Sequence, residues 1–229
     1  MKKLVVLTGA GISAESGLST FRDSGGLWEG YDVMQVASID GWHRNKELVL
    51  EFYNMRRKQS TDAKPNRGHF ALKELEKDFD VTIITQNVDD LHEKAGSENI
   101  IHLHGKLNEA KSSLDPSLIY LVKNNEINIG DKCEKGSQLR PNIVWFGEAV
   151  PMMEEAIRHV VKADILVIIG TSLVVYPAAG LLDYAPDDSI KYIIDPNIPD
   201  IYNPIPNLNF IPKKATTGVE KLLEELKSI

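Results

Sequence analysis

Short apolar runs rich in β-branched residues recur along the chain and are typical of buried strands. Four of them stand at residues 4–9, 81–87, 165–171 and 190–195, and a weaker one stands at residues 99–105. Strands that are apolar on both faces suit a parallel sheet that helices cover on both sides. The pattern therefore predicts an α/β fold with a doubly wound, Rossmann-like parallel sheet.

Apolar residues return at helical spacing between these runs. The predicted helices cover residues 46–59, 67–78, 151–163 and 216–228. For the last helix we expect a threonine cap, because Glu220 follows Thr217 at the third place, as in a capping box.

Two stretches interrupt the alternation and predict a second, smaller lobe. Residues 28–80 hold two helices before the second strand, and the polar residues 106–143 hold one predicted short helix, at residues 116–125. We expect a single domain over residues 1–229, with a mainly helical inserted lobe at about 28–80 and 106–143. The Rossmann-like lobe would then take about residues 1–27, 81–105 and 144–229.

Composition narrows the functions that the chain could have. Its 229 residues can bury a full core, and a net charge of −7 argues against direct nucleic-acid binding, which needs a basic face. No apolar run approaches the length of a membrane span, and the first residues lack a signal-peptide cleavage site, so a cytoplasmic location is expected. The single cysteine excludes an intramolecular disulfide and a zinc site made of several cysteines.

The loop after the first strand carries the first chemical signal. Its sequence, "GAGISA" at residues 9–14, matches the dinucleotide fingerprint G-x-G-x-x-A, in which Gly9 permits a tight turn and Gly11 admits a pyrophosphate close to the backbone. Taken alone, an ordinary strand–helix turn explains the match nearly as well. The acidic ribose ligand of dehydrogenases is missing from the end of a second strand, which disfavours a plain dehydrogenase.

Five stretches together are more specific than any one of them. They are "GAGISAESGLSTFRDSGGLW" (9–28), "TQNVDDLHEKAG" (85–96), "LHG" (103–105), "RPNIVWFGE" (140–148) and "GTSLVVYPAAGL" (170–181). In content, order and spacing they resemble the motifs of the sirtuins, the NAD-dependent protein deacylases.

The resemblance implies an enzyme with NAD as cofactor and an acyl-lysine protein or peptide as substrate. Its products would be nicotinamide, free lysine and 2′-O-acyl-ADP-ribose. ADP-ribosyl transfer, NAD hydrolysis and a non-catalytic module that binds NAD or ADP-ribose stay open as alternatives. A monomer is expected, and no membrane or nucleic-acid partner.

The resemblance also assigns roles to single residues. It makes His104 the general base, for which an imidazole pKa near neutrality is suited, and it gives Asn87 a part in catalysis. His102 is expected to be a surface or core histidine, and His92 to hold its loop. Asp195 departs from the asparagine usual in the family, so the adenine-ribose contact falls either to its carboxylate or to Asn197. The predicted NAD-binding residues are Gly9, Ala10, Gly11, Ser13, Phe21, Arg22, Gln86, Asn87, Asp89, Gly170, Thr171, Ser172, Asp195, Asn197 and Ala215.

The substrate side rests on two further stretches. By resemblance, Val144, Phe146 and Gly147 border the acyl-lysine tunnel on a strand that pairs with the substrate backbone, and residues 174–178 form the opposite strand. Tyr53 and Arg56 stand at helical i and i+3 positions and match the Tyr-x-x-Arg pair of the branch that prefers malonyl- and succinyl-lysine.

The alternative interpretation is that these residues lie on a solvated helix face and that the basic pair is incidental. Replacing Arg56 by Met is expected to lower the turnover of succinyl and malonyl peptides, whereas Arg57, about 100° further round the helix, is expected to tolerate the same change.

The zinc site of most sirtuins is missing from this sequence. Two C-x-x-C pairs usually supply four thiolates, whereas Cys133 is alone here, so we expect no metal. The smaller lobe should then be held by apolar packing, for which the candidates are Leu114, Leu118, Ile119, Leu121 and Val122.

Overall fold

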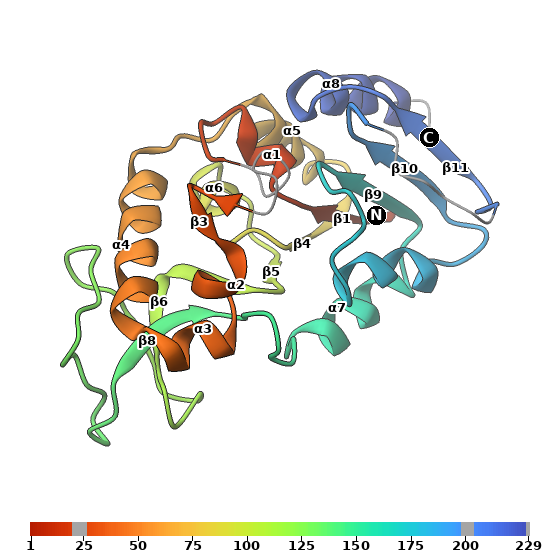
Figure 1. Cartoon of the computed structure of the whole chain (residues 1–229). Coiled ribbons are helices and arrows are strands. Elements are labelled where there is room, and N and C mark those ends of the chain that lie inside the picture. Colours follow the sequence, from red (N-terminus) through yellow and green to blue (C-terminus); the bar gives the residue numbers. More distant parts are fainter. Residues whose placement is uncertain (20–26, 198–203, 228–229) are drawn as a thin grey trace.

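A parallel sheet forms the centre of the larger lobe in the computed structural model, which describes residues 1–19, 27–197 and 204–227 (Figure 1). Within those residues six strands pair in the order β11-β10-β9-β1-β4-β5, every pair being parallel. Their bounds are β1 Lys3–Thr8, β4 Asp80–Thr85, β5 Ile100–His102, β9 Ile165–Ile169, β10 Ile190–Ile194 and β11 Leu208–Ile211. The predicted doubly wound α/β fold is confirmed, and the strand order reverses between β1 and β9.

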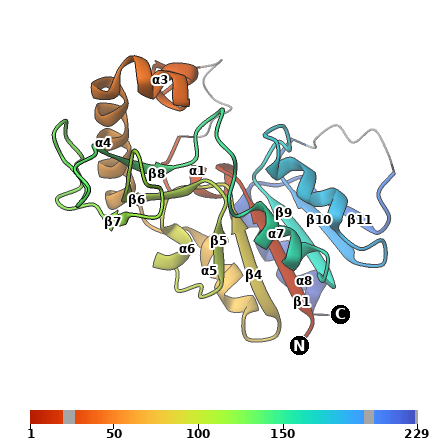
Figure 2. The ribbon, with the colours of Figure 1, turned by 90° about the horizontal axis from the view of Figure 1, so that it is seen from below.

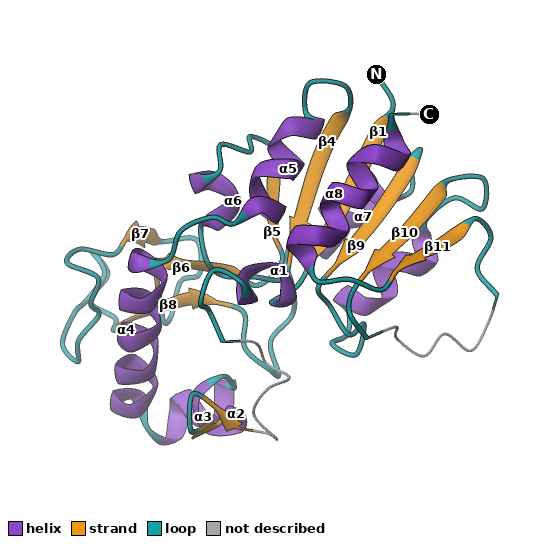
Figure 3. Cartoon of the chain, turned by 90° about the horizontal axis from the view of Figure 1, so that it is seen from above, coloured by secondary structure: helices purple, strands orange, loops and turns teal. Residues whose placement is uncertain are grey.

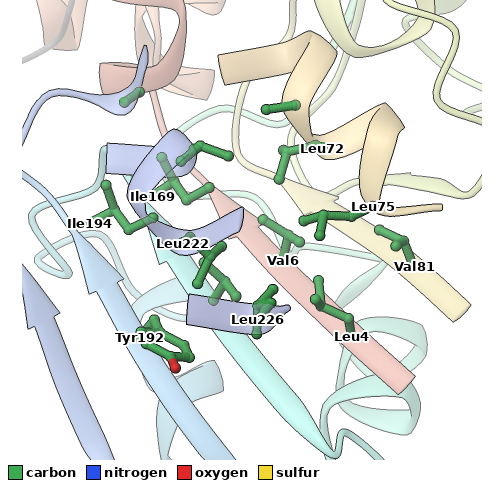
Figure 4. Close-up of a cluster of buried hydrophobic side chains, with 14 of the residues drawn as sticks. Leu4, Val6, Leu72, Leu75, Val81, Ile169, Tyr192, Ile194, Leu222 and Leu226 are labelled. Atoms are coloured by element: carbon green, nitrogen blue, oxygen red, sulfur yellow. The ribbon is translucent and has the colours of Figure 1, made fainter. Parts of the chain in front are cut away.

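Alternate residues of β1 face two separate apolar layers. Leu4 and Val6 pack into one cluster with α5 (Arg67–Leu75) and α8 (Ala215–Leu226), as Figure 4 shows. Val5 and Leu7 pack into the other cluster, with α7 (Met153–Val160) and the 3₁₀ helix η1 (Ala178–Tyr184). This period of two, apolar on both faces, is what the strand pattern predicted. None of the helices within the described ranges is long and apolar enough to span a bilayer.

The position of α5 corrects the predicted lobe boundary. The predicted smaller lobe includes residues 28–80, yet Leu72 and Leu75 of α5 lie in the apolar layer of the large sheet, against Leu222 of α8. Figure 3 shows α5 and α8 side by side over the sheet. The sequence shows that α5 is amphipathic, but it does not show which surface the apolar face packs against. The structure shows that this surface is the large sheet.

The predicted threonine cap of the last helix is wrong. Helix α8 begins at Ala215, and its N-cap residue, Lys214, makes no side-chain capping bond. Thr216 instead donates from its backbone N–H and its hydroxyl to the carboxylate of Glu15, at 3.2 and 3.1 Å. The carboxylate of Glu15, which is distant in sequence, therefore accepts the hydrogen bonds at this helix end in place of a threonine cap.

The smaller lobe combines helices with a second sheet. Its helices are α2 (Val33–Val36), α3 (Ile39–Arg44) and α4 (Lys46–Asp62), and a hairpin of β2 (Leu27–Trp28) and β3 (Tyr31–Asp32) precedes them. Across the described part of the lobe, β6 (Gly105–Ser112) pairs antiparallel with β7 (Ile119–Leu121) and with β8 (Leu139–Ile143). These strands lie beside α4 (Figure 2). Two short helices, α1 (Gly11–Ala14) and α6 (Leu91–Lys94), follow β1 and β4.

The predicted short helix over residues 116–125 is therefore wrong, although α2, α3 and α4 keep the lobe rich in helix. Residues 119–121 form β7, whose outer edge has no strand partner among the described residues. β7 leaves Leu121 75% exposed, and Leu114 is 83% exposed in the loop before it, so neither holds the lobe together. Of the five proposed residues, only Val122 packs against the lobe's apolar cluster. The buried members of that cluster come mainly from α2, α4, β6 and the end of β8, and they include Val49, Phe52, Leu107, Ile143 and Trp145.

Arg57 ties α4 to the smaller sheet. Its side chain is 2% exposed. Nε donates to the carbonyl oxygen of Leu107 on β6 at 2.7 Å, and Nη1 donates to Asn54 Oδ1 at 2.7 Å and to the carbonyl of Asn125 at 3.2 Å. Burial lowers the pKa of Arg57 to about 10, and these oxygens compensate the desolvated charge.

Replacing Arg57 by Met should destabilise the chain. The change leaves buried carbonyl groups without donors, which lowers the free energy of unfolding by about 1–3 kcal/mol in urea titrations. The neighbouring exposed Lys58→Met serves as control and should stay within about 0.5 kcal/mol of the parent. An Arg57→Met variant as stable as the control would show that the lobe does not depend on this guanidinium.

Candidate active site

One cavity of about 570 Å³ lies where the two lobes meet, and its size is typical of a ligand pocket. Gly9, Gln86, Gly170 and Asp195 line it, each of them directly after β1, β4, β9 or β10. The cavity therefore opens at the carboxyl ends of the strands and spans the point where the strand order reverses, which is where doubly wound sheets bind ligands.

The structure brings together the predicted site residues that it describes. Around this cavity lie Gly9, Ala10, Gly11, Ser13, Tyr53, Arg56, Gln86, Asn87, Asp89, His104, Val144, Phe146, Gly147, Gly170, Thr171, Ser172, Asp195, Asn197 and Ala215. Phe21 and Arg22 fall outside the described residues. The individual roles given to these side chains stay predictions.

Three glycines allow two backbone turns to touch at the floor of the cavity. Gly9 N–H donates to the carbonyl of Ile169 at 3.0 Å, and Gly11 N–H donates to that of Gly170 at 2.9 Å. A Cβ on Gly11 would lie 2.6 Å from Gly170 Cα, and one on Gly170, whose φ is +63°, would lie 2.5 Å from Ile12 N. No other residue type fits there, and the turn presents backbone rather than side chains to a ligand. A dinucleotide pyrophosphate needs such a surface.

Polar side chains from α1 and from the loop after β4 hydrogen-bond to one another on the cavity wall. Ser13 Oγ donates to Asp89 Oδ2 at 3.1 Å, and Asn87 Nδ2 donates to Ser13 Oγ at 3.1 Å. The Leu91 N–H donates to Asp89 Oδ1 at 3.1 Å. Burial raises the pKa of Asp89, while these bonds favour the carboxylate. The network fixes the orientation of Asp89 and Asn87 before any ligand arrives.

His104 is held in one tautomer by its backbone partner. Its Nδ1 lies 3.0 Å from the carbonyl oxygen of Gln86, which only accepts, so Nδ1 carries the hydrogen and Nε2 is the free acceptor. Burial lowers the pKa of His104, and this keeps the imidazole neutral near neutral pH. A neutral histidine with a free Nε2 in a cavity can accept a proton.

The two other histidines of these motifs lie outside the cavity. His102 is buried, with Nδ1 3.2 Å from the Asn87 carbonyl oxygen and Nε2 2.8 Å from Glu93 Oε1. Burial alone would raise the pKa of Glu93, but His102 and Lys106 bring it down to about 2. His92 is buried beside Thr8 Oγ1, at 3.1 Å, and burial lowers its pKa to about 3. Both positions agree with the structural roles expected for these residues.

Asp195, which stands where the resembled family usually has asparagine, lies on the cavity wall. Asp195 is buried at the end of β10, and its Oδ1 accepts the Asn197 N–H at 2.9 Å. Both residues line the cavity. Either side chain is therefore placed to meet a ribose, and the two alternatives drawn from the sequence stay open.

The two segments expected to pair with the substrate backbone are not regular strands, and Phe146 forms only an isolated parallel bridge, with Ser38. Their pairing with a substrate stays a prediction. Strand β8 ends at Ile143, and the chain beyond it bends instead of continuing as a strand. Phe146 pairs its backbone with the segment between α2 and α3, donating to Ala37 at 2.9 Å and accepting from Ile39 at 3.2 Å. Residues 174–178 likewise form a turn that leads into η1. Gly147, at φ +90°, permits the bend.

Sequence reasoning missed the clasp that shapes this bend. Arg140 donates from Nη1 and Nη2 to the two carboxylate oxygens of Glu148, at 2.7 and 2.8 Å, and its guanidinium lies 3.4 Å from the centre of the Trp145 ring. Glu148 also accepts the Trp145 N–H at 2.9 Å. The available signal was two opposite charges at the ends of the "RPNIVWFGE" motif.

Tyr53 and Arg56 are both buried on the cavity wall, so the solvated-face alternative is wrong. They are 1% and 7% exposed. The Tyr53 hydroxyl accepts the indole N–H of Trp145 at 2.9 Å, and burial raises its pKa. Arg56 Nη1 lies 3.5 Å from Glu29 Oε1, and its guanidinium stacks 4.5 Å from the Trp28 ring.

Cys133, the single cysteine of the chain, is a free and buried thiol. Cys133 Sγ lies 3.2 Å from Ser137 Oγ, and hydrogen bonding to Ser137 and Ser112 lowers its pKa to about 7. In the described residues, no group of three or more His, Cys, Asp or Glu side chains is arranged to hold a metal ion.

Comparison with known proteins decides the family. The model of the Sir2 family matches residues 9–177. The chain belongs to the Sir2, or sirtuin, family. Two curated relatives, both named NAD-dependent protein deacylase, match almost end to end. The protein from Bacteroides thetaiotaomicron is 57% identical over 99% of this chain and 98% of its own, and that from Helicobacter pylori strain 26695 is 54% identical over the same shares.

Solved Sir2 structures agree with the fold. A Sir2 homologue in complex with NAD superposes with a TM-score of 0.88 at 39% identity, covering 99% of this chain and 90% of that one. A Sir2 complex with an inhibitor, 2′-O-acetyl-ADP-ribose and a deacetylated peptide gives a TM-score of 0.79 at 30% identity, with 98% and 94% covered. The expected sirtuin family and its Rossmann-like fold are confirmed.

Breaking the Arg140 clasp should destabilise the bend at Val144–Gly147. Burial alone would raise the pKa of Glu148, but the bonds from Arg140 and the Trp145 N–H lower it on balance. The carboxylate therefore contributes stability above its unfolded pKa, and this contribution is lost as the pH falls through the folded value. Arg140→Met should lower the free energy of unfolding by about 2–3 kcal/mol at pH 7, and by less below about pH 4.

The exposed Arg158 provides the control for this measurement. It pairs with Glu154 and Glu155 on the surface of α7, so Arg158→Met should change the free energy of unfolding by about 0.5 kcal/mol or less. A pH-independent loss in Arg140→Met would mean that packing on Trp145, rather than the charge pair, accounts for the effect.

Proposed function

We propose that this protein is an NAD-dependent protein-lysine deacylase that consumes NAD, acyl-lysine and one water and yields nicotinamide, free lysine and 2′-O-acyl-ADP-ribose. The observation that carries the proposal is His104, held by the Gln86 carbonyl so that Nε2 is an acceptor at the cavity, beside the Asp89–Ser13–Asn87 network. The deacylase names of the relatives support the same activity.

Each part of the cavity then has a task. NAD supplies a ribose carbon whose bond to nicotinamide can be broken. The glycine turn at Gly9 and Gly11 leaves room for the pyrophosphate, and Asp89 with Asn87 orients the nicotinamide end. His104 Nε2 accepts the proton of a ribose hydroxyl, which makes that oxygen a better nucleophile towards the acyl group. Phe146 and Val144 line the path for the acyl-lysine.

Release of nicotinamide separates this activity from NAD hydrolysis and from a non-catalytic binding module. A deacylase releases nicotinamide only when an acyl-lysine peptide is present, in equal amount with free lysine. An NAD hydrolase releases it without peptide, and a binding module releases none. Measuring nicotinamide and deacylated peptide together therefore tests the proposal, and release independent of peptide would contradict it.

Two histidine variants test the assignment of the base. His104→Ala should lower kcat/KM by about a hundredfold or more, while the Kd for NAD stays within about tenfold, because proton transfer acts on the barrier. His102→Ala should keep activity within about tenfold but lower the free energy of unfolding by about 1–3 kcal/mol, since Glu93 and the Asn87 carbonyl lose a buried partner.

The pH profile gives the same assignment a second test. The lowered pKa of His104 keeps the base neutral into mildly acid solution, so the acid limb of kcat/KM should lie below about pH 6.5. If His102→Ala rather than His104→Ala abolished turnover, His102 would be the base.

We further propose a preference for acidic acyl groups such as malonyl and succinyl. A carboxylate buried in the cavity is costly unless a cation pairs with it, and Arg56 and Tyr53 both lie buried on the cavity wall. A guanidinium can bind a carboxylate with two parallel hydrogen bonds. The alternative, preference for acetyl-lysine, leaves Arg56 without a substrate partner.

We also propose that the enzyme works without zinc. The smaller lobe has other ties: its apolar cluster around Phe52 and Trp145, the bonds of Arg57, and the Arg140 clasp. Incubation with a strong chelator should therefore leave the melting temperature and the deacylation rate unchanged. Stoichiometric zinc in the purified protein, or melting provoked by the chelator, would contradict this.

A further inference from the structure

The tip of the β2–β3 hairpin carries a glutamate in an uncommon backbone conformation. Glu29 and Gly30 connect Trp28 to Tyr31, and both have positive φ, +53° and +84°. Two-residue hairpin loops of this kind favour asparagine or aspartate before glycine, because those residues tolerate the left-handed region. A glutamate here is a local exception, and its side chain has a specific partner.

The hairpin is fixed against α4 by aromatic contacts. The rings of Trp28 and Tyr31 meet the Phe52 ring edge-on, with centroids 5.3 and 5.4 Å apart. Trp28 also lies under the guanidinium of Arg56, at 4.5 Å. This packing carries the hairpin tip to Arg56, so that Glu29 Oε1 lies 3.5 Å from Nη1.

Arg56 is thus paired, but loosely. Its side chain is almost fully buried, and Glu29 is its only ion-pair partner within the part of the chain that the structure describes. At 3.5 Å the bond is at the limit of hydrogen-bonding distance. Burial lowers the pKa of Arg56, and the charges of Glu29 and Asp89 partly offset this. Arg56 and Trp28 line the cavity, whereas Glu29 approaches the same guanidinium from outside it.

We propose that Glu29 is a tethered carboxylate that competes with the carboxylate of an acyl group for Arg56, and so sets the balance between acidic and neutral acyl-lysine substrates. The inference rests on the proposed deacylase function and deepens it.

The competition has opposite effects on the two substrate classes. A succinyl or malonyl group must share or displace Glu29 before it can pair with Arg56, so Glu29 weakens its binding. An acetyl group offers no charge, and without Glu29 it would leave a buried guanidinium unpaired, which is unfavourable. Glu29 therefore broadens the range of acyl groups that one cavity accepts.

Peptide binding to the full-length protein tests this without requiring turnover. The Kd values of one peptide sequence, carrying succinyl- or acetyl-lysine, would be measured by calorimetric titration with ADP-ribose present. Glu29→Gln keeps the shape of the side chain and removes its charge. We expect succinyl-peptide binding to tighten about three- to tenfold, and acetyl-peptide binding to weaken or stay the same.

Two further variants isolate the pair. In an Arg56→Met background the Glu29→Gln effect should disappear, as a double-mutant cycle requires for two groups that interact directly. If Arg56→Met fails to fold, Arg56→Gln replaces it. As a control, Glu51→Gln removes an exposed carboxylate from α4, the helix that carries Arg56. This variant should leave both Kd values unchanged.

The outcomes separate this inference from the proposed function. If both peptides respond alike to Glu29→Gln, if the effect survives in Arg56→Met, or if neither peptide binds, the competition is overturned. Peptides that bind to the parent protein but are never deacylated would contradict the deacylase proposal alone. The ratio of the two Kd values would still decide the role of Glu29.

Discussion

The contact of two glycine turns is the constraint on which the rest of the site depends. Gly9 and Gly11 lie against Gly170 so closely that a Cβ on any of the three would meet backbone atoms within 2.7 Å. This approach joins the ends of β1 and β9 at the reversal of strand order. It lets Ser13, on the short helix that follows, reach Asp89 and Asn87 beyond β4. A side chain at the contact would separate the loops that form the floor of the cavity.

The smaller lobe completes the cavity through polar ties as well as apolar packing. Arg57 fastens α4 to β6, and the Arg140–Glu148 clasp shapes the chain that carries Phe146 and Gly147. Trp145 links the Arg140–Glu148 clasp to α4, since it stacks on Arg140 and donates to Tyr53 on that helix. The wall that faces the proposed acyl group is therefore one connected structure.

Much of the site could be predicted from the sequence, because its motifs are local. Glycine at residues 9, 11 and 170, the "TQNVDD" loop and His104 are each identified by neighbours in the chain, and each lies where a strand ends. The predictions that the structure contradicts concern segments whose conformation depends on distant partners. Residues 116–125 have a helical pattern, but residues 119–121 pair with β6 as a strand. Thr217 and Glu220 match a capping box, but α8 already begins at Ala215, and Glu15 accepts the hydrogens of Thr216.

The sequence by itself determined the doubly wound sheet and the set of residues at its carboxyl edge, because apolar periodicity and glycine placement are properties of the chain alone. Only the tertiary structure decided which partner each buried charge has. It placed α5 on the large sheet, made Arg57 structural while Arg56 faces the cavity, and brought Glu29 to Arg56 across 27 positions of sequence. Arg56 and Arg57 look alike in sequence, and they differ because burial and hydrogen bonding depend on what lies opposite each side chain.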